Sequence, residues 1–309
     1  MKKLTGILLI LLCVSVPVIA QVHPAFPVIR NFSEFMEKAL QLKEKYGAKN
    51  ILLAFDMDNT LMTSTTDLGS EQWFDWQESL LGRSKSPEKM ACSLDELLTL
   101  QGIFFYLFPM EPAEQGLPRI LKKLEAEGFK MLVLTSRGPE FCNATERELK
   151  SRLFDFSSAA IPAGTSYSRP FLPYDYNDIA ASGYLTKPDI SRFNLPLPAP
   201  ISYQHGILMT AGQHKGVMLQ CVLHITGYKP AAIIYIDNKE KQIERVDKAF
   251  AGSNIKVIGL RYSGCDRAAG DFEKMPEKRR AVLDQWNRIK ESILKIFPEA
   301  IFSLPSECN

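Results

Sequence analysis

Short apolar runs that end in polar residues recur along this chain, separated by segments with helical spacing. Runs of this kind, rich in Val, Ile and Leu, are typical of buried strands in a parallel sheet. The segments Gly116–Gly128 and Lys239–Phe250 carry apolar residues at helical spacing beside these runs. The alternation predicts an α/β fold with a Rossmann-like parallel sheet. The predicted strands are Ile51–Asp56, Met131–Thr135, Ile233–Asp237 and Val257–Arg261, with a further short strand at Gly206–Thr210.

Two long segments interrupt this alternation. The first, at about 62–110, contains helical patterns at Glu71–Trp76 and about Leu94–Phe108, which predicts a helical cap insertion after the first strand. The second, at about 156–204, is rich in Pro, Ser, Tyr and Gly, and predicts an irregular insertion. We expect both to leave the carboxyl ends of strands and to cover a site there.

Sequence features at the two ends of the chain complete the predicted domain organisation. The start Met1-Lys2-Lys3, an apolar stretch and Val18-Ile19-Ala20 predict a signal peptide at 1–20, with cleavage after Ala20. Its apolar run is shorter than the roughly 20 residues that span a bilayer, so we expect no membrane span in the mature chain. Helical segments are predicted at 21–47 and 265–309, around a core at 48–264. The apolar face of Glu277–Phe297 indicates a packing helix.

Charge and cysteine content narrow the function classes. The formal net charge of +2 is accounted for by Lys2 and Lys3 within the predicted signal peptide, so the rest of the chain is formally neutral. A general nucleic-acid surface would show a basic excess, so no nucleic-acid partner is indicated. The cysteines are scattered without a CxxC pair, which predicts neither a zinc site nor a full disulfide framework. An oxidising compartment would allow one or two disulfides, and their pairing stays open.

The first predicted strand ends at two carboxylates, Asp56 and Asp58, followed by Asn59 and Thr60. Ligands of open α/β sheets bind at this edge, and residues two apart in extended chain point to one side. Two like charges this close require a cation or a shared proton. One carboxylate could attack phosphorus and the other transfer a proton, with Mg²⁺ neutralising the anions. An isolated Asp-x-Asp pair is also typical of a strand-end turn.

Three further elements carry side chains suited to a phosphate site. Thr135, Ser136 and Arg137 follow the second strand, where a hydroxyl and a guanidinium can bind phosphoryl oxygens, although such a turn also fits a helix cap. Lys215 follows the strand at Gly206–Thr210 and could neutralise a phosphate. Asp237 ends another buried strand and could supply a hard oxygen ligand for Mg²⁺.

These features, in this order, resemble the haloacid-dehalogenase-like (HAD) hydrolase superfamily over most of residues 48–262. The Thr135-Ser136-Arg137 turn looks similar to secreted acid phosphatases of that superfamily. The stretches Leu68–Trp73 and Thr210–Gly216 look similar to a poorly characterised secreted bacterial branch without an assigned substrate. The resemblance implies that Asp56 is the nucleophile and Asp58 the general acid/base. It implies that the metal ligands are Asp56, Asp237 and the backbone carbonyl of Asp58. It also implies phosphate-binding roles for Thr135, Ser136, Arg137 and Lys215.

The resemblance implies a Mg²⁺-dependent phosphomonoesterase that forms an aspartyl-phosphate on a small phosphorylated substrate. Phosphomutase activity, which uses the same nucleophile, stays open. The alternative is a catalytically weak or inactive binding protein of the same fold, secreted to act on a partner protein. We expect an exported protein, periplasmic or secreted. The superfamily often has a second acid after its metal aspartate, whereas this chain has Asn238, so we expect weaker metal binding.

Overall fold

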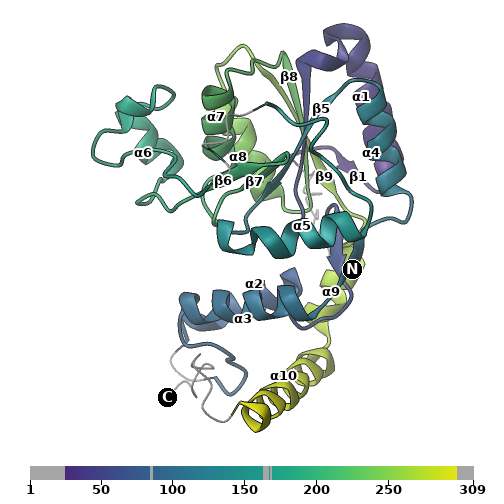
Figure 1. The fold of residues 1–309 in the computed structure, drawn as a ribbon, viewed down its shortest axis with the longest axis vertical. Coiled ribbons are helices and arrows are strands. Elements are labelled where there is room, and N and C mark those ends of the chain that lie inside the picture. Colours follow the sequence, from purple (N-terminus) through teal and green to yellow (C-terminus); the bar gives the residue numbers. More distant parts are fainter. Residues whose placement is uncertain (1–24, 84–85, 163–166, 168, 298–309) are drawn as a thin grey trace, which may run out of the picture.

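The structure, a computed structural model, describes residues 25–83, 86–162, 167 and 169–297, and the predicted signal peptide lies outside them. Its centre is a seven-stranded sheet of order β1-β9-β8-β2-β5-β7-β6 (Figure 1). Every pairing in this sheet is parallel except that of β6 with β7. The strands are β1 (Val28–Ile29), β2 (Ile51–Phe55), β5 (Lys130–Thr135), β6 (Ser202–Gln204), β7 (Ile207–Met209), β8 (Ala232–Asp237) and β9 (Lys256–Tyr262).

Helices cover both faces of the sheet, as the near-continuous apolar strands require. Side chains alternate across the central strand: Leu53 and Phe55 join the cluster under one pair of helices, whereas Leu52 and Ala54 join the cluster under the other pair. The predicted mixed α/β architecture with a mostly parallel sheet is therefore confirmed. The covering helices are α1 (Phe32–Tyr46) and α4 (Leu117–Ala126) on one face, and α7 (Lys215–Thr226) and α8 (Glu240–Phe250) on the other.

The segment at 62–110 forms two helices, α2 (Glu71–Leu81) and α3 (Leu94–Leu107). Ser70 caps α2, because its side chain accepts a hydrogen bond from the backbone N–H of Trp73 at 3.2 Å. The two ends of the segment meet in an antiparallel pair, β3 (Met62–Ser64) and β4 (Met110–Pro112). The pair holds both ends of the helical segment beside the carboxyl end of β2.

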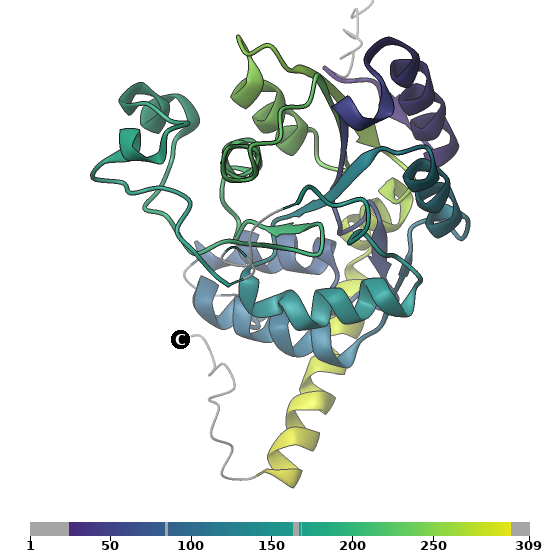
Figure 2. The ribbon, with the colours of Figure 1, turned by 45° about the horizontal axis from the view of Figure 1, so that its top comes forward.

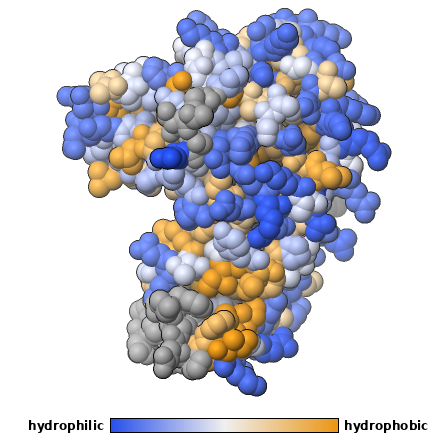
Figure 3. Space-filling model, in the orientation of Figure 1, coloured by the Kyte–Doolittle hydropathy of each residue, from blue (hydrophilic) through white to orange (hydrophobic). Residues whose placement is uncertain are grey.

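The C-terminal helices pack on α2 and α3, and these four helices are called the helical layer below. Their apolar side chains form a cluster separate from those of the sheet, in which the rings of Phe104 and Trp286 lie 5.5 Å apart. Figures 1 and 2 show this layer along one edge of the sheet, and Figure 3 shows hydrophobic (orange) residues on its surface in the same orientation as Figure 1. The C-terminal helices are α9 (Asp266–Lys274) and α10 (Pro276–Ile296).

The second long segment begins elsewhere than the sequence predicts. It follows α5 (Cys142–Ser151), and the carbonyl of Ala159 accepts from the N–H of Met131 at 2.9 Å, near the amino-terminal end of β5. The expectation that it leaves the carboxyl end of a strand is wrong, because α5 first returns the chain to the opposite edge. The segment contains a 3₁₀ turn (Ile179–Ser182) and α6 (Lys187–Phe193), which project from the body in Figure 2.

Among the residues that the structure describes, the thiols of Cys142, Cys221 and Cys265 are free, and Cys92 is disulfide-bonded. Within the described ranges, no helix is both long and apolar enough to span a membrane.

Candidate functional site

Lys215 joins two carboxylates at the carboxyl edge of the sheet. Its Nζ donates to Asp56 Oδ1 at 2.6 Å and to Asp237 Oδ2 at 2.8 Å. β2 pairs with β8, so Asp56 and Asp237 follow adjacent strands, and Lys215 begins α7 behind them. All three are almost fully buried, with 5%, 1% and 1% of their surface exposed for Asp56, Asp237 and Lys215. The fold therefore brings together three predicted site residues that lie far apart in the sequence.

This cluster carries an excess of negative charge. Burial, followed by the charge of Asp237, raises the pKa of Asp56 from 3.8 to about 8, although Lys215 opposes the shift. Burial disfavours the charge of Lys215, but Asp237 and Asp56 outweigh burial and raise the pKa of its ammonium. One lysine therefore does not fully compensate two buried carboxylates, and an additional cation would favour the ionised form of Asp56.

Threonines tie the loops at this edge together. Thr60 Oγ1 donates to Asp56 Oδ2 at 3.1 Å and accepts from the N–H of Asn238 at 3.1 Å. Thr135 is buried at the end of β5, and its hydroxyl accepts from the N–H of Arg137 at 3.2 Å. Ser136 is exposed on the wall of the cavity described below. Phosphate contacts of Thr135 and Ser136 stay predictions.

Arg137 binds Asp58 through a two-bond fork. Its Nε donates to Asp58 Oδ2 at 3.0 Å and one terminal nitrogen donates to Oδ1 at 2.7 Å, while the other donates to Thr145 at 3.1 Å. The guanidinium also lies 3.7 Å from the ring centre of Phe105 on α3. Such a bidentate contact fixes the orientation of a carboxylate. Arg137 therefore positions Asp58 in this structure, a role that differs from the predicted phosphate contact.

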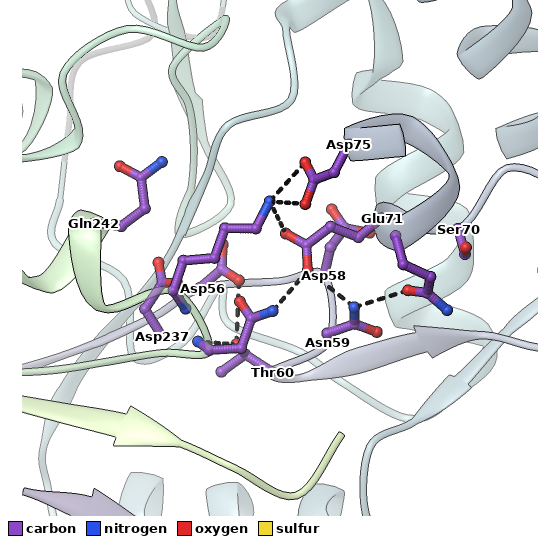
Figure 4. A network of polar contacts seen from close by, with 12 residues as sticks. Asp56, Asp58, Asn59, Thr60, Ser70, Glu71, Asp75, Asp237 and Gln242 are labelled. Carbon is purple, nitrogen blue, oxygen red and sulfur yellow. Dashed lines mark hydrogen bonds and ion pairs between the residues drawn. The ribbon is translucent and has the colours of Figure 1, made fainter. Parts of the chain in front are cut away.

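Glu71, the first residue of α2, reaches the site from the helical layer (Figure 4). Its Oε2 accepts from Asn59 at 2.9 Å and from Asn238 at 2.6 Å, and its Oε1 lies 2.9 Å from Lys239 Nζ. Burial raises the pKa of Glu71 to about 7, with Asp58 adding to the shift and Lys239 opposing it. Glu71 therefore links the loops after β2 and β8 to α2.

A cavity of about 570 Å³ lies over these residues, between the sheet edge and the helical layer. Asp56 and Lys215 line it from the sheet side, while Glu71 and Phe105 line it from α2 and α3. Ala199, in the second long segment, also lines the cavity. The side chain of Gln213 holds Ala199 in place: Gln213 Oε1 accepts from the N–H of Ala199 at 3.1 Å, and Gln213 Nε2 donates to the carbonyl of Ala199 at 2.9 Å. The cavity is large enough for a small organic ligand.

The oxygen atoms around Asp237 suit a hard cation. In the part of the chain that the structure describes, no group of three or more His, Cys, Asp or Glu side chains is arranged to hold a metal ion. The candidate donors are instead two carboxylates, Asp56 and Asp237, and the amide oxygen of Asn238. That Oδ1 atom is buried without a hydrogen-bond partner. Carboxylate and amide oxygens are Mg²⁺ ligands, so the residues fit such an ion.

A known protein family matches most of the chain. A family described as "Protein of unknown function (DUF2608)" matches residues 29–295. The chain belongs to the DUF2608 family. The match includes the sheet, α2 and α3, and most of α10, so the site lies within the part that defines the family.

Relatives of this DUF2608 protein occur in Chlamydia. A protein of Chlamydia muridarum described as "Putative outer membrane protein" is 26% identical over 220 residues, which is 71% of each chain. A Chlamydia pneumoniae protein described in the same way is 24% identical over 225 residues, covering 70% of this chain and 71% of the relative. No solved structure matches the chain significantly.

The sequence predicts the site residues at strand ends but not those that the helical layer supplies. Asp56, Lys215 and Asp237 meet as predicted, and Asp58 lies beside them. Glu71 carries no strand-end signal, and its helix-start position after Ser70 would indicate only a cap. His214 is a further buried residue beside the site: its Nδ1 accepts from the N–H of Val217 at 3.3 Å at the start of α7.

Proposed function

We propose that this protein is a phosphohydrolase that cleaves phosphomonoesters through an aspartyl-phosphate at Asp56, and that α2 and α3 form a cap over the site. The observation that carries the proposal is the buried contact of Lys215 with Asp56 and Asp237 at the base of a cavity. A buried lysine beside a carboxylate can bind the phosphoryl oxygens that approach that carboxylate. The resemblance to the HAD superfamily supports the same reaction.

The first step is attack of an Asp56 oxygen on phosphorus. The bond from phosphorus to the leaving oxygen breaks, and Asp58 donates a proton to that oxygen. Asp58 then takes a proton from water, the resulting hydroxide attacks phosphorus, and the acyl-phosphate bond breaks to regenerate Asp56. Arg137 orients Asp58 through the fork described above, so the proton donor stays at the cavity wall.

We further propose that Mg²⁺ binds at Asp56, Asp237, the Asp58 carbonyl and the Asn238 amide oxygen. Bound there, it would neutralise charge on the carboxylates and on the phosphoryl group. The raised pKa of Asp56 supports this proposal, because without an additional cation much of Asp56 is protonated at neutral pH and is a poor nucleophile.

We propose that the protein is exported. The signal pattern at 1–20 supports this, and two relatives carry the description "Putative outer membrane protein".

The test is hydrolysis of p-nitrophenyl phosphate by purified protein lacking residues 1–20, with Mg²⁺ and with a chelator. We expect turnover that requires Mg²⁺ and is abolished by Asp56→Asn, since an amide cannot form the acyl-phosphate. Asp247→Asn is the control, because it makes the same change at an exposed carboxylate of α8 that does not line the cavity. Equal activity of wild type and Asp56→Asn would refute the mechanism, and a folded protein inactive on a broad phosphomonoester panel would favour the binding-protein alternative.

A further inference from the structure

Arg245 on α8 is a cavity cation that no carboxylate neutralises. In the part of the chain that the structure describes, it forms no ion pair, and its side chain donates one hydrogen bond, to Gln242 Oε1 at 3.2 Å. The other three cations on the cavity wall are already paired. Arg137 contacts Asp58, Lys215 contacts Asp56 and Asp237, and Lys239 contacts Glu71 and Asp75.

Arg245 lines the same cavity as Asp56 and Lys215, on the α8 side. A side chain on Gly216, which follows Lys215, would clash with the backbone carbonyl of Arg245, so α7 and α8 touch at this point. The pKa of His214, which precedes Lys215, is lowered to about 4 by burial and, next, by the charge of Arg245. Arg245 therefore reaches the cavity from a helix packed against the start of α7, and its charge acts on His214 beside the lysine.

The wall at Arg245 differs in charge from the wall formed by the helical layer. Figure 4 shows Gln242 on one side of Asp56 and Asp237, with Glu71 and Asp75 on the other. Glu78 of α2 also lines the cavity from the helical layer and is exposed. A negatively charged part of a ligand would be repelled by the acidic side chains of the helical layer and attracted to the α8 wall.

We propose that Arg245, oriented by Gln242, binds a second anionic group of the substrate, a carboxylate or a second phosphate. This inference rests on the proposed hydrolysis at Asp56, because the phosphoryl group over Asp56 fixes where the rest of the substrate extends. A guanidinium can donate two parallel hydrogen bonds to either group. The cavity of about 570 Å³ has room for the body of a small substrate between the two anions.

The test compares substrates in pairs that differ by one anionic group. Phosphoglycerate is compared with glycerol phosphate for a carboxylate, and glucose bisphosphate with glucose monophosphate for a second phosphate. In wild type, we expect a KM about 10-fold lower for the member with the second anion, equivalent to about 1.4 kcal/mol. Arg245→Gln should remove this preference. Lys241→Gln is the matched control, since Lys241 is exposed on the same helix and does not line the cavity.

A binding measurement separates this inference from the proposed reaction. Calorimetric titration with both members of each substrate pair uses Asp56→Asn protein, with and without Arg245→Gln. About 10-fold weaker binding of the two-anion members with Arg245→Gln, and unchanged binding of the one-anion members, supports the subsite even if no hydrolysis is found. The subsite is refuted if neither pair shows a preference in wild type, or if Arg245→Gln weakens both members of each pair equally while circular dichroism shows a folded protein.

Discussion

Asn238 makes a contact that an aspartate could not make, because its Nδ2 donates to Glu71 Oε2 at 2.6 Å. The sequence suggests that Asn238 weakens a metal site by removing a charge, and that an acid there would strengthen it. The structure adds an opposing effect. A carboxylate at this position would face Glu71 and lie beside Asp237, and like charges this close destabilise each other.

We therefore predict that Asn238→Asp lowers the free energy of unfolding by about 1–3 kcal/mol, the usual cost of leaving a buried polar group without its partner. Glu71→Gln added to this variant should recover part of the loss, because a glutamine amide can donate to the introduced carboxylate. Urea denaturation of both single variants and the double variant in a chelating buffer measures the coupling. Additive effects of the two substitutions would show that the contact contributes nothing.

The site residues that the sequence predicts are those whose position follows from sheet topology alone. Asp56 and Asp237 end strands with apolar sequences, and parallel strands bring such ends to one edge. The partners of Arg137 and the place of Glu71 depend on how the segment at 62–110 folds back over that edge. No periodicity in that segment specifies which side chain reaches the site, so these contacts could not be predicted.

At the scale of elements, the helical layer holds the N-terminal end of α2, and with it Glu71, over the sheet. Trp286 on α10 is only 4% exposed and packs edge-on against Phe104 of α3. We predict that Trp286→Ala lowers the free energy of unfolding by about 3–5 kcal/mol through the cavity it leaves. Phosphatase activity should fall as well, since the α2–α3 pair loses its support.

Thermal unfolding and steady-state kinetics of Trp286→Ala check this prediction. Leu294→Ala on the same helix is the control, because Leu294 is 44% exposed and its truncation should cost little. A change in stability with unaltered activity would show that α10 supports the fold without positioning the proposed cap.

Long elements could be predicted from periodicity, and short ones could not. The apolar runs at β2, β5, β8 and β9 and the stripe of α10 match the predicted ranges to within about two residues. β1 and β3 are two and three residues long, too short to show a period. The amphipathic face of α10 indicates that it packs but not on which surface, which only the tertiary structure defines.

At the scale of the whole molecule, the proposed export would remove the amino-terminal segment of the chain. The charged start, the apolar stretch and Val18-Ile19-Ala20 predict removal of residues 1–20. Expression in a Gram-negative host and amino-terminal sequencing of the exported material should find Gln21 first. Exported protein that still begins at Met1, or protein that stays in the cytoplasm, would contradict the prediction. Ala20→Arg, which places a large charged residue at the expected cleavage site, should block processing.

The stability of the whole molecule should fall as pH rises above about 6.5, because Asp56 and Glu71 bind protons more tightly in the folded state than in the unfolded chain. The pKa values are raised to about 8 for Asp56 and about 7 for Glu71, from ordinary values of 3.8 and 4.5. Up to those values the folded protein keeps protons that the unfolded chain has released, so the free energy of unfolding decreases with pH. His214, with its pKa lowered to about 4, acts in the opposite direction only below its ordinary value of 6.5.

Thermal melting between about pH 6.5 and pH 8.5 tests the charge balance of the site directly, because each retained proton changes the free energy of unfolding by about 1.4 kcal/mol per pH unit. With a chelator present, we expect the Tm to fall by a few degrees across this range. Mg²⁺ should flatten the decline, since a cation beside Asp56 favours its ionised form in the folded state as well. Asp56→Asn should flatten it without Mg²⁺. A decline that Mg²⁺ leaves unchanged while Asp56→Asn reduces it to the contribution of Glu71 would show that Asp56 is buried as described but holds no metal.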